Sequence, residues 1–511
     1  MDAQQLPNDI DQLKALLLEK QSLLQEQQQR IKLLEDYIRL QKQKRFGPSS
    51  EAAPGQGELF DEAEQLLEEE QQQASSAEVP CAPASTPKKK AGRKPLSKDL
   101  PRIDIIHDLS DEEKHCQCGT ELKPIGEQVS EQLDIVPMKI QVLRHIRKKY
   151  ACPCCEQGVI TAALPPQPIP KSHASPGLLA HVAVSKYADA LPLYRQSTIL
   201  ERFDGQITRT TLANWMIQAG QLIQPLFNLL QDNLLDGQYV HCDETTVQVL
   251  KEPNKSAQSH SYMWVRVSGD ADKRIILYHY ADSRSAKVAQ SLLKDFSGYL
   301  QSDGYSGYNS VGDTEQVTAI GCWAHARRKF IEAEQSQPNQ VKNANKMNKT
   351  KMALNYIAKL YAIEQKIKDL PPDKRTEHRQ LYSDPILDEL KRWLEKTKSK
   401  VPPQTLLGKA LTYLDNQWGK LIVYTQDGRL AIDNNIAENA IRPFVVGRKN
   451  WLFANSQRGA TASANLYSLI ETAKANGLEP YAYVKRVFTD LPKATTVEQI
   501  EKLLPWEINK S

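Results

Sequence analysis

Three strand-forming segments follow one another between residues 238 and 281, and they constrain the fold more than any other feature of the chain. QYVHCDETTVQVL, SYMWVRVSG and RIILYHYA are rich in β-branched and aromatic residues and are separated by polar or Gly-containing breaks, so they predict an antiparallel meander. A predicted helix, SRSAKVAQSLLKDF, comes next. Two more predicted strands, GYLQSD and QVTAIGC, precede the predicted helix WAHARRKFIEAE.

This order of elements predicts an α/β sheet of the ribonuclease-H-like kind, in which the first and fourth strands are neighbours. Asp243 lies in the first strand and Asp303 at the end of the fourth, so their carboxylates are expected side by side at one edge of the sheet. Two ionised carboxylates so close repel each other unless a cation lies between them. Oxygen ligands without His or Cys at a fixed spacing favour Mg²⁺ or Mn²⁺ over Zn²⁺.

The best candidate for a third carboxylate is Glu438, in DNNIAENAIRPFVVGRKNWLFANSQRG. Asp433 can cap a helix that presents Glu438 inward. No other acid occurs before Glu471, and this tract interleaves basic and aromatic residues as nucleic-acid-binding surfaces do. Its basic and aromatic residues are Arg442, Arg448, Lys449, Arg458, Trp451 and Phe453. Each carboxylate alone is ordinarily a cap or a surface charge, but three together can hold two metal ions for phosphodiester chemistry.

Five of the eight cysteines fall in two tight groups, HCQCG at residues 115–119 and CPCC at residues 152–155. Two such knuckles suit a tetrahedral zinc site, because each brings two ligands to one ion. Disulfides are rare in cytosolic proteins, so zinc is favoured over free structural thiols. The predicted ligands are Cys116, Cys118, Cys152 and Cys155, with His115 as an alternative ligand.

The segment KIQVLRHIRKKY, between the knuckles, is strongly basic, and residues 135–155 contain no acid. Its cations are Lys139, Arg144, Arg147, Lys148 and Lys149. Basic charge within a predicted zinc-binding module, residues 101–165, indicates nucleic acid as its target.

The first 46 residues follow a seven-residue apolar repeat, which predicts a short coiled coil that pairs chains. The repeat consists of Ile10, Leu17, Leu24, Ile31 and Ile38. An amphipathic helix packed on the chain's own body is the alternative. Residues 47–100 read as a disordered linker with a basic end, KKKAGRKPL, which either lies along DNA or is simply solvated.

Residues 170–235 alternate helical patterns with short breaks. DGQIT predicts a turn, Thr208 or Thr210 can cap the next helix, and that helix has an apolar face. Helix, turn and helix is a possible DNA reader, and it is also the commonest packing unit of helical proteins.

Length and charge set wider limits. A chain of 511 residues exceeds one ordinary core, so two to four structured units are expected. The net charge of +4 is too small to indicate nucleic acid by itself. No apolar run approaches the length of a membrane span, so the expected location is the cytoplasm.

Four motifs closely resemble, in the same order, those of the transposase family of insertion sequence 66. They are DET at Asp243, SDGYSGY from Ser302, CWAHARRKF from Cys322 and NNIAENAIRPFVVGRKNWLF from Asn434. The paired knuckles and KYADALPLYRQ also resemble that family, so the resemblance covers nearly the whole chain. One departure is the first knuckle, which looks like CxxCG in the family but here begins with His115 beside Cys116.

The resemblance implies a DDE transposase with a ribonuclease-H-like catalytic domain at residues 236–455 and a C-terminal element at residues 456–511. It places the acidic triad on Asp243, Asp303 and Glu438, with Mg²⁺ or Mn²⁺ as the catalytic metal. It also implies a helical insertion at about residues 331–430, which accounts for the 135 residues (438 − 303) between the last two acids.

The expected reaction is nicking at the element's ends, followed by attack of the freed 3′-hydroxyl on target DNA. The backbone of that DNA would be held by Arg442, Arg448 and Lys449. His325, Arg327 and Arg328 are expected to line the same cleft, although His325 reads equally well as a helix-face residue. Expected partners are DNA, a second copy of the chain and accessory proteins of the same element. The competing hypotheses are a catalytically silent zinc-ribbon DNA-binding protein and a nuclease of the same fold.

Overall fold

The computed structural model describes residues 10–46, 140–151, 159–269, 272–312, 314–338 and 347–508. The linker and all the predicted zinc ligands, from His115 to Cys155, lie outside these ranges. The chain divides into two compact units, Ala74–Arg144 and the remainder, Met1–Gln73 with His145–Ser511. Within the described ranges, no helix combines the length and apolar character needed to cross a membrane.

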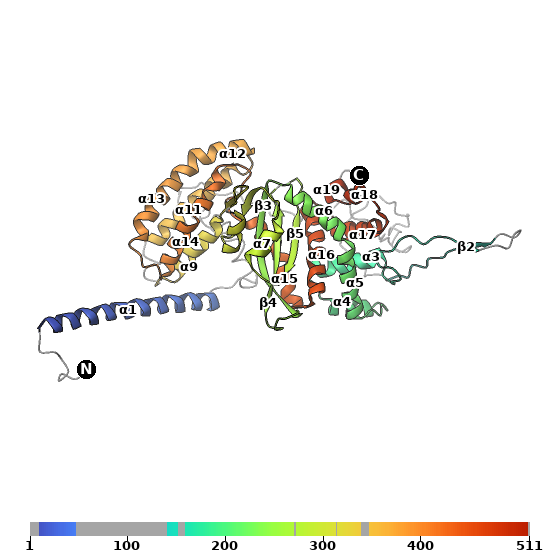
Figure 1. Ribbon diagram of the computed structural model, residues 1–511, viewed down its shortest axis with the longest axis horizontal. Helices are drawn as coiled ribbons and strands as arrows, with labels where there is room; N and C mark the ends of the chain where they lie inside the picture. Colours follow the sequence, from blue (N-terminus) through green and yellow to red (C-terminus); the bar gives the residue numbers. More distant parts are fainter. Residues whose placement is uncertain are drawn as a thin grey trace, which may run out of the picture. The chain divides into compact units, whose positions relative to one another are not determined.

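A mixed sheet forms the centre of the larger unit, with strand order β5–β4–β3–β6–β7 and β8 paired to β3 (Figure 1). The strands are β3 (Tyr239–Lys251), β4 (His260–Ser268), β5 (Ile276–Ala281), β6 (Gly298–Gln301), β7 (Val317–Ile320) and β8 (Ala454–Ser456). The first three are antiparallel, as the meander predicts, and β6 and β7 continue in parallel. The prediction that the first and fourth strands are neighbours is confirmed, because β6 pairs directly with β3.

The outer edge of β5 is closed by side chains of a helix, α16 (Gln457–Ala475). Ser468 Oγ accepts the N–H of Tyr278 at 2.7 Å, and Thr472 Oγ1 bonds both the N–H and the carbonyl of Ile276 at 3.0 Å. An open strand edge exposes unpaired backbone groups, which these hydroxyls satisfy. The C-terminal region is therefore part of the sheet's packing. It continues through α17 (Pro480–Asp490), α18 (Val497–Glu501) and α19 (Pro505–Ile508).

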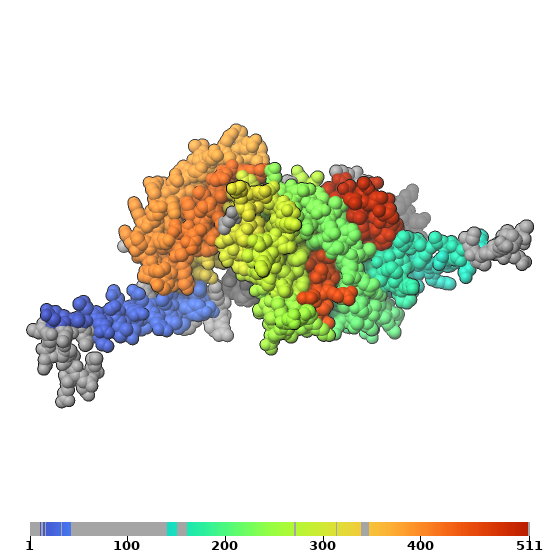
Figure 2. Space-filling view, in the orientation of Figure 1, coloured from blue at the N-terminus to red at the C-terminus, as the bar shows by residue number. Residues whose placement is uncertain are grey.

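The segment between β7 and the helix that carries Glu438 is helical, as expected. Its helices are α9 (Trp323–Gln335), α11 (Lys349–Ile367), α12 (Pro372–His378), α13 (Asp384–Lys398) and α14 (Leu406–Leu421), and α15 (Asn435–Trp451) follows. Buried residues of α11, α13 and α14, among them Ile357, Leu390 and Leu414, share one apolar core with Trp323 of α9 and Tyr239 of β3. In the space-filling view these orange helices lie beside the yellow part of the chain (Figure 2).

Four helices precede the sheet: α3 (Pro176–Tyr187), α4 (Leu193–Glu201), α5 (Arg209–Leu222) and α6 (Gln224–Leu235). Thr208 is the cap of α5, since its hydroxyl accepts the N–H of Thr211 at 3.2 Å. The predicted apolar face is confirmed by the burial of Leu212, Trp215 and Met216. α5 packs so closely on α16 that a Cβ at Gly220 would lie 2.7 Å from Ala462.

Two further elements match their sequence patterns. α1 (Ile10–Phe46) is one helix of 37 residues, and its repeat positions Leu17, Leu24, Ile31 and Ile38 are 51 to 60% exposed. The basic segment ends in β1 (Lys149–Ala151), which pairs antiparallel with β2 (Val159–Thr161). Within this segment Arg147 donates to the carbonyl of Ala162 at 2.5 Å, and the predicted DNA-binding residues Arg144, Lys148 and Lys149 are exposed.

Candidate active site

The pairing of β3 with β6 brings Asp243 and Asp303 to equivalent positions. Tyr239 lies opposite Tyr299 and His241 opposite Gln301, a constant offset of 60 residues. Continuing that register by two residues puts Asp303 at the level of Asp243 (303 − 243 = 60), just past the end of β6. Asp303 is fixed there by two bonds: its Oδ1 accepts the N–H of Tyr305 and its carbonyl accepts the Tyr413 hydroxyl, each at 2.8 Å.

Asp243 sits in an environment that opposes its ionisation. Burial raises the pKa of the Asp243 carboxyl well above its ordinary value, and the negative charges of Glu244, Asp303 and Glu438 raise it further. One backbone bond, from the N–H of Glu244 at 2.8 Å, acts in the opposite direction. The two other predicted carboxylates are therefore close enough to act electrostatically on Asp243.

Glu438 is positioned by the start of α15, where it lies in the first turn and is 4% exposed. The buried Asn434 just before that helix ties it to the sheet: its amide donates to the carbonyl of Cys242 at 2.9 Å, and its carbonyl oxygen lies 3.1 Å from His241 Nδ1. The backbone N–H of Asn434 donates to Cys322 Sγ at 3.2 Å. These bonds fix the N-terminus of α15 against both β3 and α9.

The cap of α15 differs from the prediction. Asn434, not Asp433, occupies the N-cap position, and its side chain makes no capping bond because it binds β3 instead. The carboxylate of Asp433 still accepts the N–H of Asn435 at 3.2 Å, and it also accepts the hydroxyl of Tyr361 at 2.9 Å. Asp433 therefore links the helix start to α11 of the insertion.

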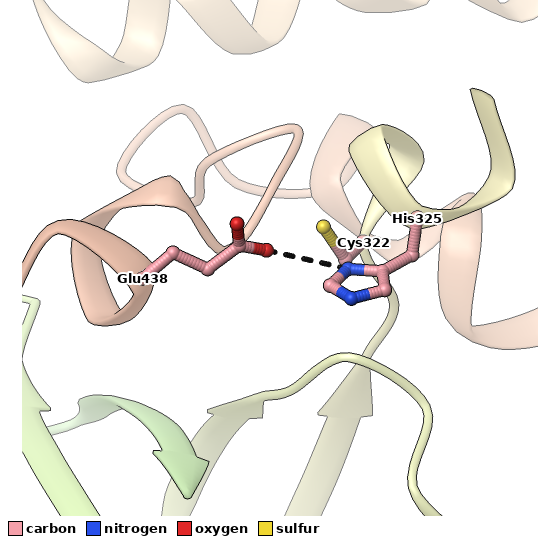
Figure 3. A group of neighbouring side chains, drawn as sticks. All are labelled: Cys322, His325 and Glu438. Carbon is pink, nitrogen blue, oxygen red and sulfur yellow. Dashed lines mark ion pairs between the residues drawn. The ribbon is translucent and has the colours of Figure 1, made fainter. Parts of the chain in front are cut away.

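The carboxylate of Glu438 points toward α9 (Figure 3). Glu438 Oε1 lies 3.3 Å from His325 Nδ1, and Oε2 lies 3.7 Å from an Arg328 nitrogen. Burial and the neighbouring Arg328 lower the pKa of His325 to about 4, so at neutral pH the contact joins a neutral imidazole to a carboxylate. Cys322 Sγ lies within 4.8 Å of the same His325 and Glu438 atoms. His325 thus contacts Glu438, a predicted site residue, in addition to lying on the face of α9.

Glu244, a further acid of the same cluster, is not among the predicted site residues. Its side chain accepts the Tyr308 hydroxyl at 2.5 Å and the Arg284 guanidinium at 2.6 Å, and these partners offset part of the burial that raises the pKa of this carboxyl. Arg284 also stacks on the ring of Tyr305, with 3.8 Å between the guanidinium carbon and the ring centroid. The sequence signal was present, since Glu244 belongs to DET and both tyrosines belong to SDGYSGY.

The predicted DNA-binding residues near the triad are not all exposed. Arg327 is 5% exposed, so it lies inside the helix packing, whereas the sequence predicted that it lines the cleft and binds DNA. Arg448 binds β3, since one of its guanidinium nitrogens donates to the hydroxyl of Thr245 at 3.1 Å and to the hydroxyl and carbonyl of Thr246. Arg442 is partly exposed and Lys449 is exposed.

The three acids fit a hard divalent cation. Their donor atoms are all oxygens, the set that Mg²⁺ prefers. The ionised form of Asp243 is opposed by burial and by three negative neighbours, a condition that a bound cation would relieve. Among the described residues, however, one group of three brings its ligand atoms within 4.8 Å of one another, and it consists of Cys322, His325 and Glu438. Glu438 therefore lies closer to these two residues than to a shared position with the two aspartates.

Comparison with protein-family models gives four matches along the chain. "Transposase IS66 family" matches residues 171–462 and "zinc-finger binding domain of transposase IS66" matches residues 113–156. "IS66 C-terminal element" matches residues 468–506 and "Transposase C of IS166 homeodomain" matches residues 33–105. The second match contains both cysteine knuckles and supports a structural zinc site.

Several proteins of Sinorhizobium fredii are similar over most of their length. Uncharacterized protein y4jD is 34% identical over 80% of this chain and 81% of its own length. Uncharacterized protein y4qI is 33% identical over 81% of this chain and 79% of its own. Uncharacterized protein y4hP is 30% identical over 88% of this chain and 84% of its own.

Proposed function

The chain belongs to the IS66 transposase family, and on that premise we propose that it is a DDE transposase that cuts and joins DNA at the ends of an insertion sequence. The observation that carries the proposal is the register of Asp243 and Asp303 on neighbouring parallel strands, with Glu438 close enough to raise the pKa of Asp243. We assign the mixed sheet to the ribonuclease-H-like class, because three antiparallel strands followed by two parallel ones carry the acids where the first and fourth strands meet.

Two Mg²⁺ or Mn²⁺ ions held by Asp243, Asp303 and Glu438 would activate a water or a DNA 3′-hydroxyl and stabilise the leaving oxygen of the phosphodiester. The strands fix the two aspartates, while α15 carries Glu438 on a helix that Asn434 clamps to β3. One set of carboxylates serves both cleavage and joining, because each step is an in-line displacement at phosphorus.

His325 acts in this proposal as a positioning residue. Its neutral imidazole lies with Nδ1 3.3 Å from Glu438 Oε1, and Arg328 contributes a positive charge to the same carboxylate. These contacts orient the Glu438 carboxylate, which together with Asp243 and Asp303 would hold the divalent cation.

DNA is held by surfaces outside the triad. Arg442 and Lys449 on α15 would contact the backbone near the reacting phosphate. The element's ends would be bound by the zinc module and by the exposed residues Arg144, Lys148 and Lys149. α5 would provide a second surface that recognises DNA. The exposed repeat of α1 would pair two copies of the chain in a coiled coil, and accessory proteins of the element would join that assembly.

The test is incubation of the full chain, with its element's accessory proteins and Mg²⁺, with a labelled DNA carrying the element's own terminus. Asp303→Asn should abolish nicking while leaving binding to the terminus intact. Asp388→Asn, which changes an exposed acid on α13, is the matched control and should retain nicking.

The products separate the competing functions. Nicks that become joined to target DNA support a transposase, whereas nicks without joining indicate a nuclease. Binding without nicking in both wild type and variant would overturn the catalytic proposal in favour of a silent DNA-binding protein.

A further inference from the structure

The chain leaves α15 through a strained turn. Leu452 has φ 68° and ψ −53°, and the N–H of Phe453 donates to the carbonyl of Trp451 at 2.9 Å, which defines a γ-turn of the rare, positive-φ kind. The Cβ of a leucine disfavours this conformation, so the turn stores strain. Strain of this type persists only where the surrounding structure holds it, and it is concentrated at ligand-binding and active sites.

Both ends of the turn are fixed to the fold. The ring of Trp451 packs edge-on against Phe444 at 5.4 Å between centroids, and the amine of Lys186 lies 5.1 Å from the same ring. Immediately after the turn, β8 pairs in parallel with the far end of β3, with Ala454 opposite Val249. The turn is therefore a rigid projection between two anchored elements.

The projection is apolar and its surroundings are basic. Leu452 is 63% exposed and Phe453 is 43% exposed. Three exposed cations are close in the chain or across the β3–β8 pair: Lys449, Arg458 and Lys251. Residues 439–470 contain four basic residues and no acid. An apolar tip with exposed cations close to it in the chain and across the strand pair suits nucleic acid, because cations hold phosphates while apolar side chains contact bases.

We propose that Leu452 and Phe453 form a wedge that inserts between stacked bases of the bound DNA. This inference rests on the proposed function, since it takes DNA as the substrate, and it adds a local opening of that DNA. Leu452 follows Glu438 by 14 residues (452 − 438), which corresponds to about 20 Å along α15. A duplex that runs along α15 would then be opened about six base pairs from the bond that is cut.

A base-stacking measurement on the full chain tests the wedge directly. The probe is a short duplex in which 2-aminopurine stands beside a central mismatch, where unstacking is least costly. Ca²⁺ replaces Mg²⁺, so that the result does not depend on cleavage. Wild-type protein should bind the mismatched duplex more tightly than the matched one, and the 2-aminopurine fluorescence should rise severalfold on binding.

Four variants separate the wedge from general binding. Leu452→Gly removes the side chain and suits the positive φ, so the turn should be kept. Both Leu452→Gly and Phe453→Ala should lose the fluorescence rise and weaken binding to the mismatched duplex about tenfold. Leu381→Ala, which removes an equally exposed leucine (63%) from the insertion, should behave as wild type. Lys449→Gln should weaken binding to both duplexes alike and lower the salt dependence.

Other outcomes would overturn the wedge. Wild-type binding without a fluorescence rise, an unchanged rise in Leu452→Gly and Phe453→Ala, or no binding to either duplex would each do so. Light scattering without DNA tests whether the turn instead contacts a second copy of the chain. If Leu452→Gly and Phe453→Ala lower the molecular mass of the assembly, the turn is a contact between chains. Because nicking is measured separately, the experiments distinguish a protein that opens DNA without cutting it from one that cuts DNA without opening it.

Discussion

Arg379 and Asp243 are both buried charged residues, but their surroundings treat the charge in opposite ways. Arg379 is fully buried and donates to both oxygens of Glu364, at 2.8 and 2.6 Å. Its remaining donors bind the backbone carbonyls of Tyr424, Asp427 and Leu430 at 2.7 to 2.9 Å. Asp243 instead accepts a backbone hydrogen bond from the N–H of Glu244 and lies among negative neighbours.

Arg379 is therefore a charge that stabilises the fold, whereas Asp243 is a charge that would be stabilised by a bound ligand. A buried ion with all its hydrogen bonds made holds its partners in fixed positions. Arg379 fixes the carbonyl of Leu430 in this way, four residues before Asn434, which binds β3 at the start of the helix that carries Glu438. A buried carboxylate beside other carboxylates weakens the fold unless a cation joins it. The insertion therefore stabilises the position of α15, whereas the proposed triad lowers the stability of the fold in return for a ligand site.

The largest effect on stability is expected from breaking the Arg379 cluster. Arg379→Met should lower the free energy of unfolding by about 3–5 kcal/mol, because the carboxylate of Glu364 is left buried without its main partner. Urea denaturation followed by tryptophan fluorescence measures this. Adding Glu364→Leu to Arg379→Met should restore much of the loss.

The matched control is an exposed ion pair of the same insertion. Lys374 and Glu377 are 2.7 Å apart with side chains 58% and 62% exposed, so Lys374→Ala should leave the unfolding midpoint unchanged. Equal stability of Arg379→Met and wild type would show that the cluster does not hold its partners in place as described above.

A smaller effect, on activity, is expected at His325. His325→Ala should lower the nicking rate about 10- to 100-fold, because Glu438 loses the group that orients it, and should raise the Mg²⁺ concentration needed for half-maximal rate. His325→Gln keeps a donor and should recover part of the rate. His279→Gln on β5 is the control, since burial also lowers the pKa of that imidazole to about 4.

The pH profile distinguishes positioning from proton transfer. Because burial and Arg328 hold the pKa of His325 at about 4, the imidazole is neutral from about pH 6 upward. The factor lost in His325→Ala should then be constant between about pH 6 and 9. A factor that changes across this range would indicate a general acid or base instead.

Strand pattern and residue spacing were enough to predict the sheet order and the pair Asp243 and Asp303, because both are set by local periodicity and by one parallel pairing. The helix carrying Glu438 was predictable for the same reason. The Arg379 cluster was not, since it joins Glu364 to Leu430 through tertiary packing without a sequence pattern. Ser468 and Thr472 likewise read as ordinary helix residues, and only the docking of α16 makes them the cap of β5.

The direction in which side chains point was the second feature that could not be predicted from the sequence. Arg448 has the composition of a phosphate contact, yet its guanidinium binds β3, which the order of residues does not reveal. The γ-turn at Leu452 also lacks a signal, because Gly or Asn would ordinarily mark a positive φ. Such positions follow from what holds the chain on either side, here Trp451 and β8.

The smallest expected change in stability is at Asp243, and its sign is opposite to that expected at Arg379. Asp243→Asn removes a repelled charge and should raise the free energy of unfolding by about 0.5–2 kcal/mol at neutral pH without divalent metal, while abolishing nicking. Burial and neighbouring acids raise the pKa of Asp243 in the folded state, so its protonated form stabilises the wild type at low pH and that stability is lost as pH rises through the folded pKa.

The gain of Asp243→Asn over wild type should therefore grow as pH rises through this range, and Mg²⁺ should reduce it by stabilising the wild type alone. Thermal melts over a pH series, with and without Mg²⁺, measure both trends. A variant less stable than wild type in metal-free buffer would mean that Asp243 is compensated as fully as Arg379. The triad would then be a structural cluster, and the case for a cation between these carboxylates would lose its electrostatic basis.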